Sequence, residues 1–485
     1  MKTKISRRDV IKSVATVTVG GLAGTSLAQE MLHGSKISSE ISPDIKVLPP
    51  GPKSIALIER VKNVIGKTNY TGLYGVVASG GHGIYMTDVD GNVYLDCLAA
   101  ASTNILGSNH TAIAQAYFDS ASKIPNTAFG YTPNMETIEL AEELIKLTPG
   151  NFPKKVMLGV SGSDANGGAI EVMRRYTGKM GLISFNNAYH GSTGLSQQAS
   201  GFIGLKTGIY QNSPDFIKMD YPTTLKQRDK ILKDIEAVLA WGTVGGVLIE
   251  PIQGDAGIIV PYEGFFTRLK ELLHQYNVLL IDDEVQSGMG RTGKWWAIEH
   301  EDVIPDLIVS GKGLSGGYAP ISALIGRAEV IDILEPAQQI FTYTGHGPSA
   351  AAALKVIQFI RQEGIVKNAA EAGGHLLDGL KRAVGKYPDI FTEARGRGLM
   401  IGLEINISDN NLANKIFAYR CLEKGIYFGY FGPGQKVIRI EPPLVMTQKE
   451  ADIIINTVFQ VADEMHNKKV PELTIEKVKK YALGW

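Results

Sequence analysis

The chain has 485 residues, of which 44% are hydrophobic and 20% charged, and its 49 basic residues balance its 49 acidic ones. This composition excludes a disordered chain, a collagen-like repeat and a disulfide framework, which need low hydrophobicity, abundant glycine or many cysteines. A net charge of zero offers no basic excess for a polyanion, so we expect neither nucleic acid nor a stable membrane anchor as a partner. The composition favours a globular protein that acts on small molecules.

The N-terminal residues 1–28 have the features of an export signal. Arg7 and Arg8 precede a mildly apolar stretch, residues 13–27, that is too short and too weakly apolar to span a membrane. The segment resembles a twin-arginine signal peptide. We therefore predict export to the periplasm or beyond by the twin-arginine pathway, with a cytoplasmic location as the alternative. The proline-rich residues 29–55 predict an extended linker.

Beyond the linker, short apolar runs alternate with helical patterns, which predicts a mostly parallel sheet covered by helices. The runs of strand length are residues 156–160, 181–185, 244–249, 278–281 and 307–310. A polar motif follows each run, and the carboxyl ends of parallel strands meet at one edge of a sheet. We therefore expect these motifs to converge on one site. From about residue 350, an alanine-rich helix and the runs 398–405 and 437–440 predict a smaller α+β lobe.

The first polar motif, Ser161-Gly162-Ser163, joins a predicted strand to a helix expected over residues 164–176. The backbone N–H groups at the start of a helix bind phosphate well. The two serines would also cap the helix without any ligand, so both interpretations stay open at this point.

Three acids, Asp282, Asp283 and Glu284, follow a later strand and could bind a metal, act as acid or base, or pair with a cationic ring nitrogen. No histidine stands nearby to complete a zinc site, and magnesium or calcium would need more oxygen ligands, so we predict no metal. We expect at least one of the three acids to lie in a solvated turn.

Lys312 lies between Gly311 and Gly313, directly after an apolar run. The glycines leave room for a planar adduct, and burial would make the amine a nucleophile. A solvated surface lysine is the alternative. Tyr189 could stack on a flat ligand or belong to the core.

In this order, the motifs resemble those of class III aminotransferases, enzymes of fold type I that depend on pyridoxal 5′-phosphate (PLP). The resemblance covers nearly all of residues 70–485 and is strongest over residues 280–293 and 310–320. It implies an α/β fold with a large domain, built on a mostly parallel sheet covered by helices, and a smaller α+β C-terminal domain. The expected division is an N-terminal segment contributing to the small lobe (56–104), a PLP-binding large domain (105–345) and a small domain (346–485).

The resemblance also implies roles for residues around the cofactor. Lys312 matches the lysine that forms the Schiff base, and Asp283 the aspartate that pairs with the pyridinium nitrogen. Gln286 matches the residue near the ring hydroxyl. The phosphate cradle matches Gly162 and Ser163, and Tyr189 matches the aromatic residue that stacks on the ring.

Three further matches concern the substrate and a partner subunit. Arg439 matches the arginine that holds a substrate carboxylate, and Glu250 the glutamate that can pair with this arginine. Thr342 matches a threonine that reaches the phosphate of the partner's cofactor, which implies a homodimer or a dimer-based tetramer.

The activity implied is that of a transaminase, which moves an amino group between an amino acid and a 2-oxo acid through an internal aldimine on Lys312. An amino-acid racemase of the isoleucine 2-epimerase type is the alternative, because residues 98–102, 161–166 and 189–193 look like that branch. Racemisation would need a second acid on the opposite face of the cofactor. A non-catalytic exported binding protein is the third hypothesis, which the intact Lys312 and Asp283 disfavour.

Overall fold

A computed structural model describes residues 41–70, 72–202, 213–407 and 412–481. The predicted export signal and the first part of the predicted linker lie outside these residues. Within the described ranges, every helix is too short or too polar to cross a lipid bilayer. Cys97 and Cys421 are buried free thiols.

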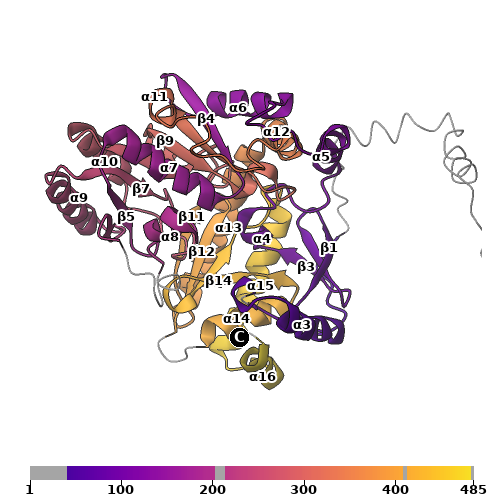
Figure 1. Ribbon diagram of the computed structural model, residues 1–485. Coiled ribbons are helices and arrows are strands. Elements are labelled where there is room, and N and C mark those ends of the chain that lie inside the picture. The colour runs from indigo at the N-terminus through magenta and orange to yellow at the C-terminus, as the bar shows by residue number, and fades with distance from the viewer. Residues whose placement is uncertain (1–40, 71, 203–212, 408–411, 482–485) are drawn as a thin grey trace, which may run out of the picture.

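The centre of the fold is a seven-stranded sheet with the strand order β4-β10-β9-β8-β7-β5-β6 (Figure 1). Strands β9, β8, β7, β5 and β6 run parallel to one another, whereas β10 is antiparallel to both β4 and β9. The strands are β4 (Lys154–Gly159), β5 (Gly181–Phe185), β6 (Phe216–Met219), β7 (Val244–Ile249), β8 (Leu279–Asp283), β9 (Leu307–Ser310) and β10 (Ser322–Arg327). The sheet is mostly parallel, as predicted.

Helices cover both faces of this sheet. Strand β8 is buried along its whole length, and its successive side chains point to opposite faces. Ile281 packs with Ile170 of α7 (Gly162–Thr177), whereas Leu280 packs in the cluster that holds Leu269 of α10 (Phe265–Gln275). The near-continuous apolar runs follow from this burial on two faces. The other helices of this part are α8 (Gly194–Ala199), α9 (Leu225–Leu239) and α11 (Ala328–Ile331), with short 3₁₀ helices at Ala297–Glu301 and Lys312–Ser315.

Two four-stranded sheets lie beside the central one. Strands β11, β12, β15 and β14 form an antiparallel sheet, and β1, β2 and β3 from the N-terminal part are joined by β13, which pairs parallel to β3. The strands are β1 (Ala78–His82), β2 (Tyr85–Asp88), β3 (Val93–Asp96), β11 (Phe391–Arg397), β12 (Met400–Ile405), β13 (Ile426–Tyr427), β14 (Gly429–Phe431) and β15 (Val437–Ile440). The β3–β13 pairing ties the N-terminal segment to the C-terminal lobe.

The remaining helices surround these sheets, and α12 packs against α5 and α6 (Figure 1). They are α3 (Pro52–Val64), α5 (Thr111–Lys123), α6 (Met135–Leu147), α12 (Gly347–Gln362), α13 (Ile365–Lys386), α14 (Ala413–Glu423), α15 (Gln448–His466) and α16 (Glu472–Tyr481), with short 3₁₀ helices at Lys67–Asn69 and Pro433–Gln435. The short turn α4 (Ala99–Ser102) is left-handed, with φ between 46° and 69° at its four residues. The domain boundaries predicted above stay predictions.

Candidate active site

A pocket of about 170 Å³ lies where the polar motifs leave the carboxyl ends of the parallel strands. The start of α7 and the segments that follow β5, β7, β8 and β9 each contribute to its wall, which is the convergence expected from the strand-end motifs. Its lining residues are Gly162, Ser163, Asn166, Tyr189, His190, Gly191, Glu250, Asp283, Val285, Gln286 and Lys312. Seven of the residues singled out in the sequence lie in this list. Thr342 and Arg439 are not among the described residues that line the pocket.

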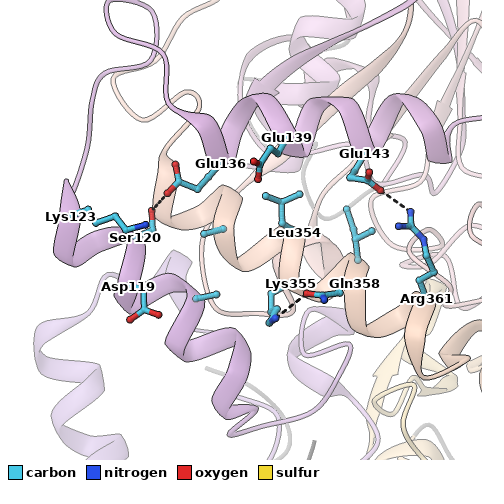
Figure 2. Close-up of a pocket in the computed structure, with 13 residues that line it drawn as sticks. Asp119, Ser120, Lys123, Glu136, Glu139, Glu143, Leu354, Lys355, Gln358 and Arg361 are labelled. Carbon is cyan, nitrogen blue, oxygen red and sulfur yellow. Dashed lines mark hydrogen bonds and ion pairs between the residues drawn. The ribbon is translucent and has the colours of Figure 1, made fainter. Parts of the chain in front are cut away.

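A second hollow of about 410 Å³ lies between α5, α6 and α12 (Figure 2). Three pairs of its polar side chains interact: Arg361 pairs with Glu143 at 2.8 Å, Lys355 donates to Gln358 at 2.9 Å and Ser120 donates to Glu136 at 3.1 Å. The groove has side chains of both charges and lies on helices, whereas ligands of open α/β sheets bind beyond the carboxyl ends of the strands. The pocket at the strand ends is therefore the candidate active site.

Asp283 ends strand β8 and is 3% exposed. Its Oδ2 accepts a hydrogen bond from Asn166 Nδ2 at 2.8 Å and lies 2.7 Å from His190 Nδ1, and its Oδ1 accepts from Val285 N at 3.1 Å. Asn166 is in turn tied to the backbone oxygen of His190 at 2.9 Å. Three contacts hold this carboxyl group in one orientation at the pocket wall.

Lys312 begins the short 3₁₀ helix that follows β9, and its Nζ donates to Gln286 Oε1 at 3.0 Å. Its φ of +40° is in the left-handed region, which a residue with a side chain adopts at a cost and which is concentrated at functional sites. A Cβ on Gly313 would lie 2.8 Å from Ile105 Cδ1, so a larger residue there would require the Ile105 side chain to move. The backbone thus presents one lysine to the pocket between two residues without side chains.

Gly162 and Ser163 form the first turn of α7, where backbone N–H groups have no partner within the helix. The Ser161 side chain accepts a hydrogen bond from Asp164 N, so it caps the helix. A Cβ on Gly162 would lie 3.0 Å from Val285 Cγ1, and a Cβ on Gly191 would lie 2.6 Å from Ser163 Oγ. This close approach of bare backbone makes a cradle that fits a phosphate group.

Glu250 lies at the pocket wall with both oxygens bound by backbone N–H groups. Tyr189 N donates to Oε1 and Gly254 N donates to Oε2, each at 2.9 Å. Burial, and then the nearby charge of Asp283, raise the pKa of Glu250 to about 8. Glu250 is therefore mostly a neutral carboxyl group at pH 7.

Glu250 and Arg439 do not pair with each other in this structure, and their predicted pairing stays a prediction. Arg439 of β15 instead bonds Asp255 Oδ1 through its NH1 at 2.6 Å, and its Nε lies 3.2 Å from Glu441 Oε2. The backbone donors already bind Glu250, and as a neutral group it offers less attraction to a cation. Arg439 is 1% exposed and its guanidinium carbon lies 3.4 Å from the centroid of the Phe431 ring, a cation–π contact.

The expectation that at least one of the three acids at the end of β8 lies in a solvated turn is wrong. Asp282, Asp283 and Glu284 are all buried, with exposures of 0%, 3% and 1%. Because side chains alternate along a strand, Asp283 faces the pocket on the α7 side and Asp282 faces away from it. A two-residue period could have assigned these faces from the sequence.

Four residues of the site or its surroundings were not assigned a role from the sequence: Asn166, His190, Asp255 and Glu441. Asn166 follows Ser163 by one helical turn, which places both near the same end of α7. His190 and Glu441 stand beside predicted residues in the chain, but nothing in their spacing indicates that they turn toward Asp283 and Gln286. Thr342 is exposed, and its backbone oxygen accepts from Asn126 Nδ2 at 3.2 Å.

Comparison with known proteins gives the family. The sequence profile of the family described as aminotransferase class-III matches residues 66–461. The chain is 35% identical over 451 residues to the alanine/serine racemase of Pyrococcus horikoshii, covering 88% of this chain and 94% of that protein. It is 32% identical to the isoleucine 2-epimerase of Lentilactobacillus buchneri, covering 86% and 96%. It is also 32% identical to the acetylornithine aminotransferase of Methanothermobacter thermautotrophicus, covering 80% and 94%.

A solved structure agrees in fold. A transaminase from the marine bacterium Virgibacillus is similar with a TM-score of 0.79 and 27% identity, covering 85% of this chain and 99% of that one. The fold is that of the fold type I enzymes. The chain belongs to the class III aminotransferase family. The predicted family, fold type and enzyme class, a transaminase of this family, are confirmed.

Proposed function

We propose that this chain binds PLP in the pocket around Lys312 and uses it to transfer amino groups between amino acids and 2-oxo acids. The observation that carries the proposal is the grouping, in one pocket, of a lysine amine, a buried aspartate and a helix N-terminus. These three groups match the aldehyde, the ring nitrogen and the phosphate of PLP. When bound, PLP supplies a protonated ring that withdraws electrons from a substrate carbon.

The residues of the chain divide the remaining work. Backbone N–H groups of Gly162 and Ser163 hold the phosphate, and Asp283, kept in place by Asn166 and His190, accepts the hydrogen of the ring nitrogen. Lys312 Nζ would be the base that takes the proton from the α-carbon of the substrate and returns it to the carbon that forms the aldehyde group in free PLP. Tyr189 stacks on one face of the ring and excludes water there.

Arg439 binds the carboxylate of the substrate through its planar guanidinium fork. Its NH1 is held by Asp255 at 2.6 Å, so a substrate carboxylate has to compete with Asp255 or share the arginine with it. The Phe431 ring, whose centroid lies 3.4 Å from the guanidinium carbon, helps to hold this group in place. We infer that the substrates carry a carboxylate next to the reacting amino group.

Racemisation of amino acids is the second candidate, and a specific observation favours it. Two of the similar proteins named above are an amino-acid racemase and an epimerase. Racemisation needs a proton donor on the face opposite Lys312, and Asp255 is a carboxyl group already in contact with the arginine proposed to hold the substrate. Asp255 is the residue we assign to this role if the enzyme racemises.

One incubation separates the two functions. The purified enzyme with PLP is given an L-amino acid in deuterated water, with and without a 2-oxo acid, and the products are separated on a chiral column. Transamination predicts a new amino acid only when the 2-oxo acid is present. Steady formation of the deuterated D-amino acid without any 2-oxo acid would contradict transamination and favour racemisation. Loss of this activity in an Asp255→Asn variant would support Asp255 as the proton donor.

We also propose a homodimer in which Thr342 reaches the cofactor phosphate of the partner. Thr342 lies in a surface rich in exposed apolar side chains: Phe118, Ile124, Tyr131, Met135, Ile138, Ile340, Phe341 and Tyr343. A soluble protein rarely leaves so many large apolar side chains exposed in neighbouring segments unless they form an interface. We call these eight residues the apolar face.

We further propose that the chain is exported in folded form by the twin-arginine pathway. The proposal depends on Arg7, Arg8 and the apolar stretch that follows them, which lie outside the described residues. Transport of a folded protein would allow PLP to bind in the cytoplasm first. Replacing both arginines by lysine should leave the protein in the cytoplasmic fraction, and unchanged export of that variant would contradict the proposal.

A further inference from the structure

Glu441 is a fully buried acid that directly follows strand β15. Its backbone N donates to Cys97 O at 2.7 Å, which attaches this segment to the N-terminal part of the chain. Its side chain crosses to the central domain, where Oε1 and Oε2 lie 2.9 and 3.0 Å from Gln286 Nε2 and accept its hydrogens. No role was expected for this residue.

The contact decides which way the Gln286 amide points. A carboxylate has only acceptors, so the amide must turn its NH₂ group toward Glu441 and its carbonyl oxygen the other way. That oxygen, Oε1, accepts from Lys312 Nζ at 3.0 Å. Gly254 closes the remaining side, because a Cβ there would lie 2.1 Å from Gln286 Oε1.

Glu441 also lies near Arg439, but that contact is of another kind. Its Oε2 is 3.2 Å from Arg439 Nε, yet this nitrogen has no partner of hydrogen-bond geometry within the described part of the chain. The directional bonds of the Glu441 side chain go to Gln286. The carboxylate therefore acts on the orientation of the amide, and the arginine adds charge balance to a buried group.

We propose that Glu441 is a positioning residue that holds the Gln286 carbonyl oxygen toward Lys312 and the PLP ring. It does not touch the cofactor and acts through Gln286. A side-chain amide that is already oriented loses less entropy when the cofactor binds, so the effect falls on cofactor affinity. The inference rests on the proposed PLP site.

The first test measures PLP binding to the apo-form of the full chain, by quenching of tryptophan fluorescence. We expect Glu441→Ala to raise the dissociation constant by about fivefold or more, as the loss of a hydrogen bond to a charged group does. The same substitution should have no further effect in a Gln286→Ala background, since it acts through that amide. Glu441→Gln keeps one acceptor and should bind PLP nearly as well as the wild type.

A second test exchanges the amide group at position 286 and the carboxyl group at position 441, which have nearly the same size and shape. Gln286→Glu alone sets two carboxylates against each other and should weaken PLP binding by about tenfold. Adding Glu441→Gln restores a donor and an acceptor with the polarity reversed and should recover most of the affinity. This pair of variants retains the volume of the site, so it remains informative if Glu441→Ala fails to fold.

The matched control is Glu423→Ala in α14. Glu423 is a buried acid of the same lobe, bound by Arg420 and Thr474, and it should leave PLP binding unchanged. Additive effects of Glu441→Ala and Gln286→Ala, or an exchanged pair no better than Gln286→Glu, would overturn the proposal. The proposal would also be overturned if Glu441→Ala left PLP binding unchanged and raised only the KM for the amino acid. That result would mean that Glu441 acts on Arg439 and not on Gln286. If the wild type itself failed to bind PLP, the proposed function would fall instead.

Discussion

Glu250 is the residue of the pocket whose charge depends most on its surroundings. Backbone donors bind both oxygens, but burial and the charge of Asp283 raise its pKa to about 8. A second negative charge beside Asp283 is thereby avoided at neutral pH. While Glu250 keeps its proton, it adds no negative charge to the pocket. It then does not repel the anionic cofactor that we propose binds there.

This protonation predicts a pH dependence of cofactor binding. Above about pH 8, Glu250 ionises, and its new negative charge should weaken the binding of the PLP phosphate. A Glu250→Gln variant keeps the neutral form and should lack that decline. The measurement is the PLP dissociation constant of both proteins between about pH 6.5 and 9.5, compared as a ratio so that titration of PLP itself cancels. Parallel profiles for the two proteins would contradict the assignment.

The polar residues at the strand ends predict many of the residues that line the pocket. They do not predict which of these side chains bind each other. Lys312, Asp283 and Gln286 were singled out because each follows a buried strand, and they line one pocket. The partner of Arg439 was not found, because Asp255 and Glu250 are only five residues apart on one loop. Which of them faces the arginine depends on the course of that loop, and no periodicity encodes it.

Strand β8 carries acids to both faces of the sheet. On the face away from the pocket, neither oxygen of Asp282 has a hydrogen-bond partner among the described residues. Glu284 accepts from Ser287 Oγ at 2.5 Å and from Ile298 N at 2.9 Å. Burial, and then the nearby carboxyl groups, raise the pKa of Asp282 well above its usual range, and burial raises that of Glu284 to about 8. The raised pKa values of Asp282 and Glu284 mean that their protonated forms favour the folded state.

The raised pKa of Glu284 sets the sign of a stability change. The folded state holds a proton that the unfolded chain releases near pH 4.5, so the free energy of unfolding should fall as the pH rises from about 4.5 to about 8. Glu284→Gln cannot ionise and should flatten this slope, with a difference on the order of a few kcal/mol between pH 5 and 8. Urea unfolding of both full-length proteins at these pH values measures it, and equal slopes would contradict the prediction.

The bounds of the buried strands were predictable, whereas strand direction was not. Strands β5, β7 and β9 begin and end where the apolar runs do. Strand β10 turns out antiparallel to both neighbours, although a buried apolar run reads the same in either direction. The short connection from Ser310 to Ser322 was the available signal, because a parallel crossover usually needs a longer one. The residue types at Ala99–Ser102 do not predict its left-handed conformation, because its three alanines favour a right-handed α-helix.

The whole molecule presents the apolar face on segments that contact one another. Asn126 bonds the backbone of Thr342 at 3.2 Å, and a Cβ on Gly130 would lie 2.2 Å from Ile340 Cδ1. Tyr131, which follows Gly130 in the chain, is 89% exposed. If a second copy of the chain covers this face, Thr342 is delivered to the partner's pocket and each site depends on both chains.

We expect Tyr131→Glu to convert the proposed dimer to a monomer, because a charge placed in an apolar interface must be desolvated without a partner. The monomer should also bind PLP more weakly, since Thr342 no longer reaches the neighbouring site. Sedimentation velocity gives the mass, and PLP titration gives the affinity. The control is Trp241→Glu, which alters another exposed aromatic residue, 66% exposed, away from this face. A Tyr131→Glu variant that stays dimeric would place the interface elsewhere.

The central claim is that Lys312 holds PLP in the strand-end pocket. Sodium borohydride reduces the bond between PLP and a lysine amine, after which peptide mass spectrometry locates the modified residue. We predict one pyridoxyl-phosphate group per chain, on the peptide that contains Lys312, and none on a folded Lys312→Ala variant. A label on another lysine, or no label on the wild-type protein saturated with PLP, would contradict the account.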